Sequence, residues 1–421
     1  MAILFLAGSE RPEVLSRYAN EVQRYAHKLP TVEIYLDGHP VSPGSFAESE
    51  GEVALVLLHS KGTGIVRSNK DGLHLELSMN ELFEVPGNAS PFYLRLKVGG
   101  DGNFMVNTDH VSSFPLSHAH GDVRAFASWD SLLRTVNGAA ESLEPLSTVS
   151  CEQSSCASFN NFEGVVFSRR GEGDVAEVLS EMIYDAVKRS APRRSLAVMS
   201  SGGVDSAILL KVSADLGLAP LAITVGLKGS NDFQAARYVA TAVGADSVEV
   251  IMEKDDAVRS AKYVISSLSL KSAMDVSIAT IFYSVAEVAR SHNRRVLVAG
   301  QGADELFGGY HKYLRLNESE ISDVLRSDAL NLWRDAVRRD YAASAIGGCA
   351  LLLPYLDRTL FHFAMNLPPH LKLSGGERKV ILRRVAEKVG LPREVAERPK
   401  KAAQYSSRLE GVLKPIVHNI Y

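Results

Sequence analysis

Short apolar segments alternate with longer amphipathic segments from about Gly171 onward. The apolar segments are residues 195–199, 221–225, 248–252 and 296–299. The longer segments carry apolar residues at helical spacing, and Asp174 with Glu177 predicts a capping box at the start of the first one. Strands that alternate with helices form βαβ units, which build a parallel sheet covered by helices on both faces. The C-terminal part is therefore predicted to be a doubly wound α/β domain.

The first 145 residues have a different pattern, rich in strands. Strand character is clearest in residues 52–58, 92–98 and 123–128, which Gly, Asn and Asp residues separate. Residues 146–161 are crowded with Ser, Asn and Cys and are interpreted as a connection that ends near Gly171. Because 421 residues exceed one ordinary core, we predict two domains, residues 1–160 and 172–421.

The amino-acid composition gives no support for a nucleic-acid-binding, membrane-spanning, disulfide-rich or zinc-binding protein. Lys and Arg total 46 against 49 Asp and Glu, a net charge of -3, which gives no electrostatic footprint for nucleic acid or an anionic membrane. No apolar run is long enough to span a bilayer, and the apolar start of the chain reads as a buried strand. Cys151, Cys156 and Cys349 form neither a disulfide framework nor a zinc motif, and His118 and His120 lack a third ligand nearby. A cytoplasmic protein is expected.

The first chemical motif, S-S-G-G-V-D-S, follows the strand at 195–199 and opens a helix. Paired glycines let the backbone approach a ligand, and a helix N-terminus offers N–H groups to an anion. The predicted pyrophosphate-binding residues are Ser200, Ser201, Gly202, Gly203 and Ser206. Asp205 would repel phosphate directly, so it is interpreted as a magnesium ligand. A Ser/Gly turn with an aspartate cap is the alternative, and the strand–loop–helix context argues against it.

The second motif, G-Q-G-A-D-E-L-F-G-G-Y at residues 300–310, follows the strand at 296–299. In open α/β sheets ligands bind at the carboxyl ends of the strands, so Asp205 and Asp304 are expected to meet there. Two carboxylates and triphosphate oxygens suit the octahedral shell of magnesium. Gly300 and Gly302 are assigned to nucleotide binding. A structural loop whose acids cap a helix is the alternative for this motif taken alone.

Together the two motifs resemble the synthetase domain of asparagine synthetase B and its relatives, the β-lactam synthetases. The resemblance extends over most of residues 172–410. Further similar segments are residues 222–244, L-L-P-Y-L-D-R-T-L-F-H-F-A, K-V-I-L-R-R-V-A and the basic R-P-K-K-A-A-Q-Y-S. The resemblance implies a PP-loop sheet of the adenine nucleotide α-hydrolase type, with ATP and Mg²⁺ as cofactors.

The resemblance also implies roles for individual residues. A carboxylate substrate would be adenylated by ATP, and ammonia or another amine would then displace AMP. Lys400 is assigned as the lysine that stabilises charge in this step; Lys401 is the alternative, and a solvated surface pair is a third reading. The other assignments are Gln301 and Glu305 as catalytic residues and the backbone of Val225 and Gly226 facing adenine.

The chain departs from the family in three respects, and the first two leave the identity of the substrate open. Gln301 replaces a glutamate or tyrosine and cannot act as a base. Ala350 and Leu352 replace a Glu and an Arg before the P-Y-L-D segment. Aspartate is therefore only the leading expectation, and a β-lactam-synthetase-like ligase acting on a larger metabolite is the alternative. A silent regulatory pseudo-synthetase is a further alternative, against which the intact Asp205 and Asp304 argue.

The third departure concerns the N-terminal domain. Asp109-His110 followed by Pro115-Leu116 is similar to a segment of the family's glutaminase domain, but the chain begins Met1-Ala2-Ile3 without the nucleophilic cysteine. We therefore expect an α+β sandwich of the N-terminal-nucleophile type that lacks glutaminase chemistry. Expected partners are a small carboxylate, ammonia or an amine, a separate glutaminase subunit, and a second copy of the chain.

Overall fold

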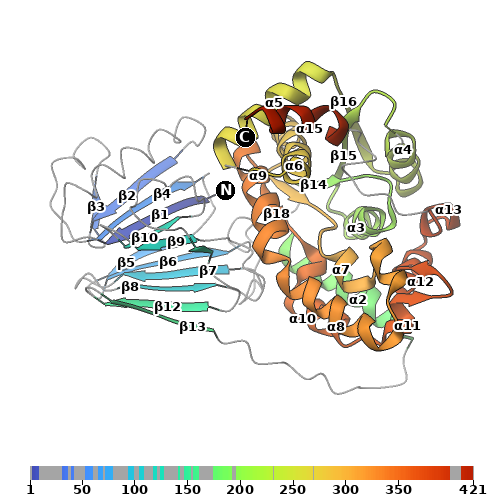
Figure 1. Cartoon of the computed structure of the whole chain (residues 1–421), viewed down its shortest axis with the longest axis horizontal. Helices are drawn as coiled ribbons and strands as arrows, with labels where there is room; N and C mark the ends of the chain where they lie inside the picture. Colours follow the sequence, from blue (N-terminus) through green and yellow to red (C-terminus); the bar gives the residue numbers. More distant parts are fainter. Residues whose placement is uncertain are drawn as a thin grey trace. The chain divides into compact units, whose positions relative to one another are not determined.

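A computed structural model describes the strands of the N-terminal region and residues 174–191, 196–230, 232–268, 270–398 and 409–420. The chain divides into two compact units (Figure 1). Unit 1 comprises Met1–Glu163, Ser267–Ser269 and Trp333–Gly348. Unit 2 comprises Gly164–Ser266, Leu270–Leu332 and Cys349–Tyr421.

Unit 1 contains two antiparallel sheets among its described residues. The first has the order β11 (Glu141–Ser142), β9 (Ser117–His120), β10 (Arg124–Ala127), β1 (Ala2–Gly8), β4 (Val53–His59), β2 (Thr31–Leu36), β3 (His39–Val41). The second has the order β13 (Ser155–Asn160), β12 (Ser147–Glu152), β8 (Phe104–Thr108), β7 (Tyr93–Val98), β6 (Gly72–Ser78), β5 (Ile65–Asn69). The three strands predicted from sequence are confirmed as β4, β7 and β10. The interpretation of residues 146–161 as a connection is wrong, because this stretch contains the paired strands β12 and β13.

Unit 2 is built on a parallel sheet of five strands. Its order is β16 (Asp246–Met252), β15 (Leu221–Leu227), β14 (Leu196–Met199), β17 (Val296–Val298), β18 (Ala350–Leu352). The four predicted strands are confirmed, and β18 is an additional strand that was not predicted from the sequence. The order reverses between β14 and β17, because the chain runs outward from β14 to β16 and then returns to the other side. This is the doubly wound pattern that the sequence predicted.

The described helices all follow residue 173; those of unit 2 cover this sheet and extend beyond it, whereas α9 belongs to unit 1. They are α2 (Val175–Ser190), α3 (Val204–Asp215), α4 (Asp232–Val243), α5 (Lys254–Leu268), α6 (Ala273–Ser291), α7 (Ala303–Phe307), α8 (Glu318–Asn331), α9 (Arg338–Gly347), α10 (Arg358–Met365), α11 (Pro369–Lys372), α12 (Val380–Lys388), α13 (Arg393–Ala396) and α15 (Leu409–Ile420). Helices α3 and α4 lie on one face of the sheet, and α6 with α15 lies on the other (Figure 1). Right-handed crossovers require this division when the strand order reverses.

Burial explains why the strands read as continuous apolar runs. Every residue of β15 is buried, because helices cover both faces of the central strands. The edge strand β16 is more exposed, with Ile251 at 54%.

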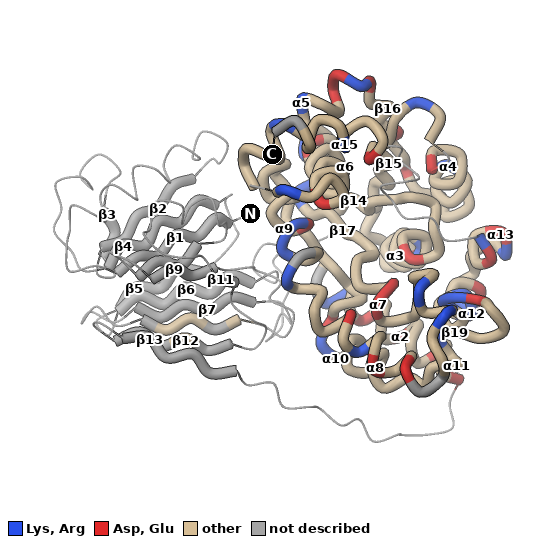
Figure 2. The backbone as a smooth tube through the Cα atoms, viewed as in Figure 1, with Lys and Arg blue, Asp and Glu red and all other residues tan. Residues whose placement is uncertain are grey.

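No single described helix is long and apolar enough to cross a membrane, and among the described residues only the pair α5 and α6, bent by 105°, reaches the necessary length and composition. Acidic and basic residues are interspersed along unit 2 (Figure 2).

Local capping differs in part from the sequence prediction. The Asp174 carboxylate accepts a hydrogen bond from the N–H of Ala176 at 3.0 Å, so the predicted N-cap of α2 is confirmed. Glu177 does not complete a capping box among the described contacts, and its carboxylate lies 3.1 Å from the ammonium of Lys388 on α12. A long-range ion pair thus replaces the local hydrogen bond that the spacing predicted.

Lys372, at the end of α11, gives a prediction of pH dependence. Its side chain is buried, and burial lowers its pKa from 10.5 to about 8. Between these two pH values the unfolded chain holds a proton that the folded chain has lost, so this residue makes stability rise with pH.

We expect Lys372→Met to be more stable than the parent protein at pH 7, by on the order of 3 kcal/mol from the shift in pKa. The difference in unfolding free energy should shrink as pH rises from 8 to 10.5, the range given by the two pKa values. Parallel denaturant titrations of both proteins across this range measure it. A difference that stays constant with pH would show that Lys372 does not carry the effect.

Candidate active site

The loop between β14 and α3 depends on two glycines. Gly202 has a φ of +69°, and a Cβ atom there would lie 2.5 Å from the backbone of Ala235 and 2.5 Å from the guanidinium of Arg398. A glycine is therefore needed at this position. Gly203 is the N-cap residue of α3 and has no side chain with which to cap the helix. No side chain therefore caps the first N–H groups of α3, and the binding of an anion by them stays a prediction.

The serines of this loop occupy two kinds of position. Ser200 is buried and continues β14, where its carbonyl accepts a hydrogen bond from the Thr224 hydroxyl at 2.8 Å. The Ser206 hydroxyl donates to the carbonyl of Gly203 at 3.2 Å, and the N–H of Gly203 donates to Ser201 Oγ at 3.4 Å. Ser200 is thus anchored by the sheet, whereas Ser201 and Ser206 fix the shape of the loop.

Two aspartates follow neighbouring strands of the sheet. Asp205 lies in the first turn of α3, which follows β14, and Asp304 lies in α7, which follows β17. These strands are paired at the point where the strand order reverses, the usual ligand site in doubly wound sheets. Gly300 permits close approach, since a Cβ atom there would lie 3.0 Å from Cβ of Asp205. The fold brings both predicted carboxylates to one place.

Lys379 completes this group and was missed by the sequence analysis. Its ammonium contacts Oδ2 of Asp205 and lies 2.6 Å from Oδ1 of Asp304. The side chain is 2% exposed, and the residue precedes α12 with a left-handed φ of 59°. Burial would lower the pKa of Lys379, but the two carboxylates outweigh it and hold the pKa above its ordinary value. The residue opens the K-V-I-L-R-R-V-A segment, while our assignment of an active-site lysine fell on Lys400.

The two carboxylates fit a magnesium ion by their chemistry. Both are hard oxygen ligands, and Oδ1 of Asp205 is buried without a hydrogen-bond partner among the described residues. The described part of the chain contains no group of three or more His, Cys, Asp or Glu side chains arranged to hold a metal. A magnesium ion here would therefore need further oxygens from a bound ligand, which is its usual behaviour with phosphates.

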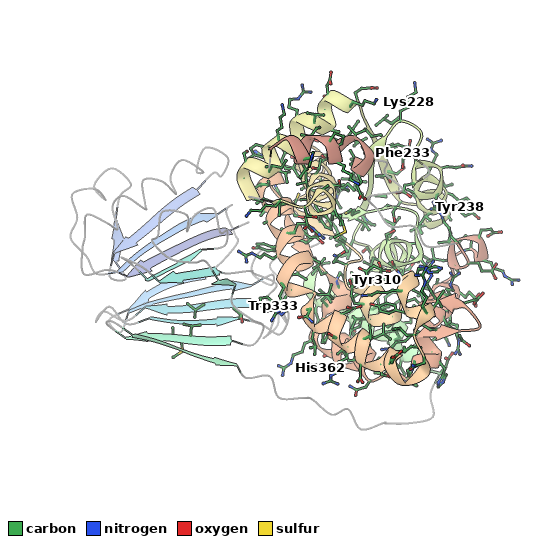
Figure 3. All side chains as sticks on the ribbon, in the orientation of Figure 1. Lys228, Phe233, Tyr238, Tyr310, Trp333 and His362 are labelled. Atoms are coloured by element: carbon green, nitrogen blue, oxygen red, sulfur yellow. The ribbon has the colours of Figure 1, made fainter. Side chains whose placement is uncertain are left out.

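The residues after Asp304 pack tightly against the same group. A Cβ atom on Gly309 would overlap Oδ1 of Asp304 and Cε of Lys379. The Tyr310 hydroxyl (labelled in Figure 3) donates a hydrogen bond to the buried carboxylate of Glu305 at 2.6 Å. Tyr310 is 37% exposed, and its partial desolvation, with the charges of Glu305 and Asp304, raises its pKa above the usual value, so it stays a donor.

The P-Y-L-D segment, residues 354–357, contacts the loops that carry the two aspartates. The buried Tyr355 donates its hydroxyl hydrogen bond to the backbone carbonyl of Asp205 at 3.0 Å. Gly302, with a φ of +90°, packs where a Cβ atom would lie 2.9 Å from Cγ of Leu356. Asp357 caps α10 by accepting from the N–H of Thr359 at 3.0 Å. This segment thus holds both aspartate loops in place.

The other residues singled out from the sequence lie in β15, in the turn before α7 and in β18. Val225 and Gly226 are buried near the carboxyl end of β15, where they pair with β16. Gln301 lies in the turn between Gly300 and α7 and is partly buried. Ala350 and Leu352 are buried in β18, so these two positions belong to the core of the sheet.

The C-terminal segment contacts the loop between β14 and α3 through Arg398. Its guanidinium donates to the carbonyl of Ser201 at 3.2 Å and lies 3.8 Å from a carboxylate oxygen of Asp232. Burial lowers the pKa of Arg398, while Asp232 opposes the shift. Lys400 and Lys401 lie outside the described residues, so our lysine assignment stays a prediction. The contact of Arg398 was not foreseen.

Comparison with known proteins identifies the family. The model of the asparagine synthase family matches residues 178–345 and 316–420, which together cover more than half of the chain. The chain belongs to the asparagine synthase family. The putative glutamine-hydrolysing asparagine synthetase 1 of Methanocaldococcus jannaschii is 27% identical over 292 residues, covering 61% of this chain and 54% of that protein.

Other relatives match a smaller share of the chain. The glutamine-hydrolysing asparagine synthetase of Gallus gallus is 31% identical over 239 residues, covering 54% of this chain and 42% of that protein. The chain thus spans about half the length of the curated relatives that it matches. Among solved structures, the NMN synthetase from Francisella tularensis is 11% identical with a TM-score of 0.32, covering 58% of this chain and 87% of that one.

The packing around Gly309 gives a prediction. In Gly309→Ala the new methyl group overlaps Asp304 and Lys379, so we expect the free energy of unfolding to fall by about 1–3 kcal/mol, as for other overpacked cores. Gly411→Ala in α15 is the matched control, because a Cβ atom there meets nothing within 4 Å. The control should be unchanged or stabilised by up to about 1 kcal/mol. Equal stability of both variants in urea titrations would show that the Gly309 contacts are not tight.

Proposed function

We propose that the protein is an ATP-dependent amide-forming ligase of the asparagine synthetase type. The observation that carries this proposal is the meeting of Asp205 and Asp304 at the ends of β14 and β17, beside a glycine loop at the N-terminus of α3. Family membership supports it. A bound magnesium ion would be held by these two aspartates and would neutralise phosphate charge.

The proposed reaction has two steps. A carboxylate oxygen of the substrate attacks the α-phosphorus of ATP, and the bond to pyrophosphate breaks. An amine then attacks the acyl carbon, AMP leaves with the carboxylate oxygen, and the amine loses a proton. The N–H groups that begin α3 would hold the departing pyrophosphate, which is work of positioning and charge stabilisation. Lys400 remains the proposed lysine for the acyl-transfer step.

Aspartate and ammonia are the first substrates to test, and a ligase acting on a larger metabolite is the second candidate. The partly buried Gln301 favours the second, because an amide cannot accept a proton in the way that a carboxylate does. A separate glutaminase subunit could supply ammonia, and we propose a cytoplasmic location for the enzyme. A silent regulatory protein would bind ATP without releasing pyrophosphate.

Pyrophosphate release from ATP and Mg²⁺ tests the proposal, with a panel of carboxylic acids and with ammonium or glutamine as the amine source. We expect Asp304→Asn to lower the rate about a hundredfold or more, since a preorganised charge is lost. Asp328→Asn is the matched control, because Asp328 also pairs with a lysine, Lys312, at 2.6 Å, and it should change the rate less than about threefold.

Each result has a distinct meaning. Release that requires aspartate and ammonium identifies an asparagine synthetase that uses ammonia, and release that requires another acid identifies the second candidate. Measurable ATP binding without pyrophosphate release, for any acid in the panel, would contradict the ligase and favour the regulatory alternative.

A further inference from the structure

Lys379 occupies the space that a metal ion shared by the two aspartates would need. Its ammonium contacts Oδ2 of Asp205 and lies 2.6 Å from Oδ1 of Asp304, so it bridges the two carboxylates. A magnesium ion binds such oxygens at about 2.0–2.1 Å and demands a near-octahedral shell around itself. A metal ion that bridges the carboxylates through these two atoms would compete with the ammonium, while Oδ1 of Asp205 has no hydrogen-bond partner among the described residues.

The position of Lys379 is built into the backbone. The residue precedes α12 with φ 59° and ψ 35°, a conformation that a residue with a Cβ atom seldom adopts. Arg378 beside it donates a hydrogen bond to the carbonyl of Gly309 at 2.7 Å. Gly309 in turn leaves room for Cε of Lys379, which a methyl group would displace. These contacts direct the ammonium to the carboxylates.

The charges explain why a cation is needed at this place. Without Lys379, the two partly buried carboxylates, 15% and 17% exposed, would repel each other across a short distance. One ammonium leaves a single net negative charge. A divalent cation added to all three groups would instead lie beside the ammonium, and the two cations would repel each other.

We propose that the ammonium of Lys379 takes the place of a divalent metal ion between Asp205 and Asp304 and competes with that ion for the two carboxylates. This inference rests on the proposed function for the identity of the metal. It implies that a free divalent ion binds weakly, because it must displace the ammonium. A metal ion that arrives with a nucleotide brings phosphate oxygens, which offer the displaced ammonium a new anionic partner. The site thus favours the metal–nucleotide complex over the free metal.

Removing the ammonium should tighten the binding of free metal. We expect Lys379→Met to bind Mn²⁺, a paramagnetic substitute for Mg²⁺, at least tenfold more tightly than the parent protein, without nucleotide. Electron paramagnetic resonance of free Mn²⁺ during titration measures this. The additional Asp205→Asn exchange should abolish the gain, since it removes one of the two ligands.

Lys388→Met is the matched control. Lys388 also bridges two carboxylates, Asp174 and Glu177, at 3.1 Å each, but it is 37% exposed and contacts neither Asp205 nor Asp304. Its exchange should leave Mn²⁺ affinity unchanged. If Lys379→Met binds Mn²⁺ no more tightly than the parent protein, the competition does not exist and Lys379 only holds the aspartates in position.

Folding of the variant is followed by circular dichroism with and without Mn²⁺. A Lys379→Met protein that is unfolded alone and folds on adding 10 mM Mn²⁺ supports the inference, because the metal then replaces the ammonium. A protein that stays unfolded at this concentration overturns it. All these measurements omit ATP and acid substrate, so they remain informative if the parent protein releases no pyrophosphate, the result that would contradict the proposed function.

Discussion

The interaction on which unit 2 depends is the contact of one buried ammonium with two carboxylates. Asp205 arrives from β14, Asp304 from β17 and Lys379 from the start of α12, so three parts of the chain meet through charge. Removing one member of such a buried group leaves a charge without its partner, which costs about 3–5 kcal/mol. The two aspartates follow strands of the sheet, and their contacts with Lys379 hold the start of α12 against the ends of these strands.

The sheet could be predicted from the sequence because its signals are local. Apolar runs such as residues 221–225 are long enough to read as buried strands, and β15 is buried along its whole length. Asp205 and Asp304 could be expected together because each follows a strand of one parallel sheet, whose carboxyl ends form the ligand site. The short strand β18 escaped because three apolar residues carry no periodic signal.

The third member of the site could not be predicted in the same way. Lys379 and Asp205 are 174 positions apart in the sequence, and no spacing rule links them. A lysine before an amphipathic helix is ordinarily a solvated charge, so local patterns favour the wrong reading. The contacts of Arg398 with Ser201 and of Tyr355 with Asp205 escaped for the same reason. Each of them depends on tertiary packing.

The P-Y-L-D segment shows how a recognisable motif can position the residues of a site without itself contacting a ligand. Tyr355 holds the backbone of Asp205, and Leu356 packs where only a glycine at position 302 leaves room. Asp357 caps α10 and pairs with Arg189 at 2.9 Å, which ties the segment to α2. Because the geometry of the aspartates must be held within fractions of an ångström to be useful, a substitution in this segment would disturb the site without touching a ligand. The resemblance of this segment to the family motif is thus explained by its packing, which holds the two aspartates in position.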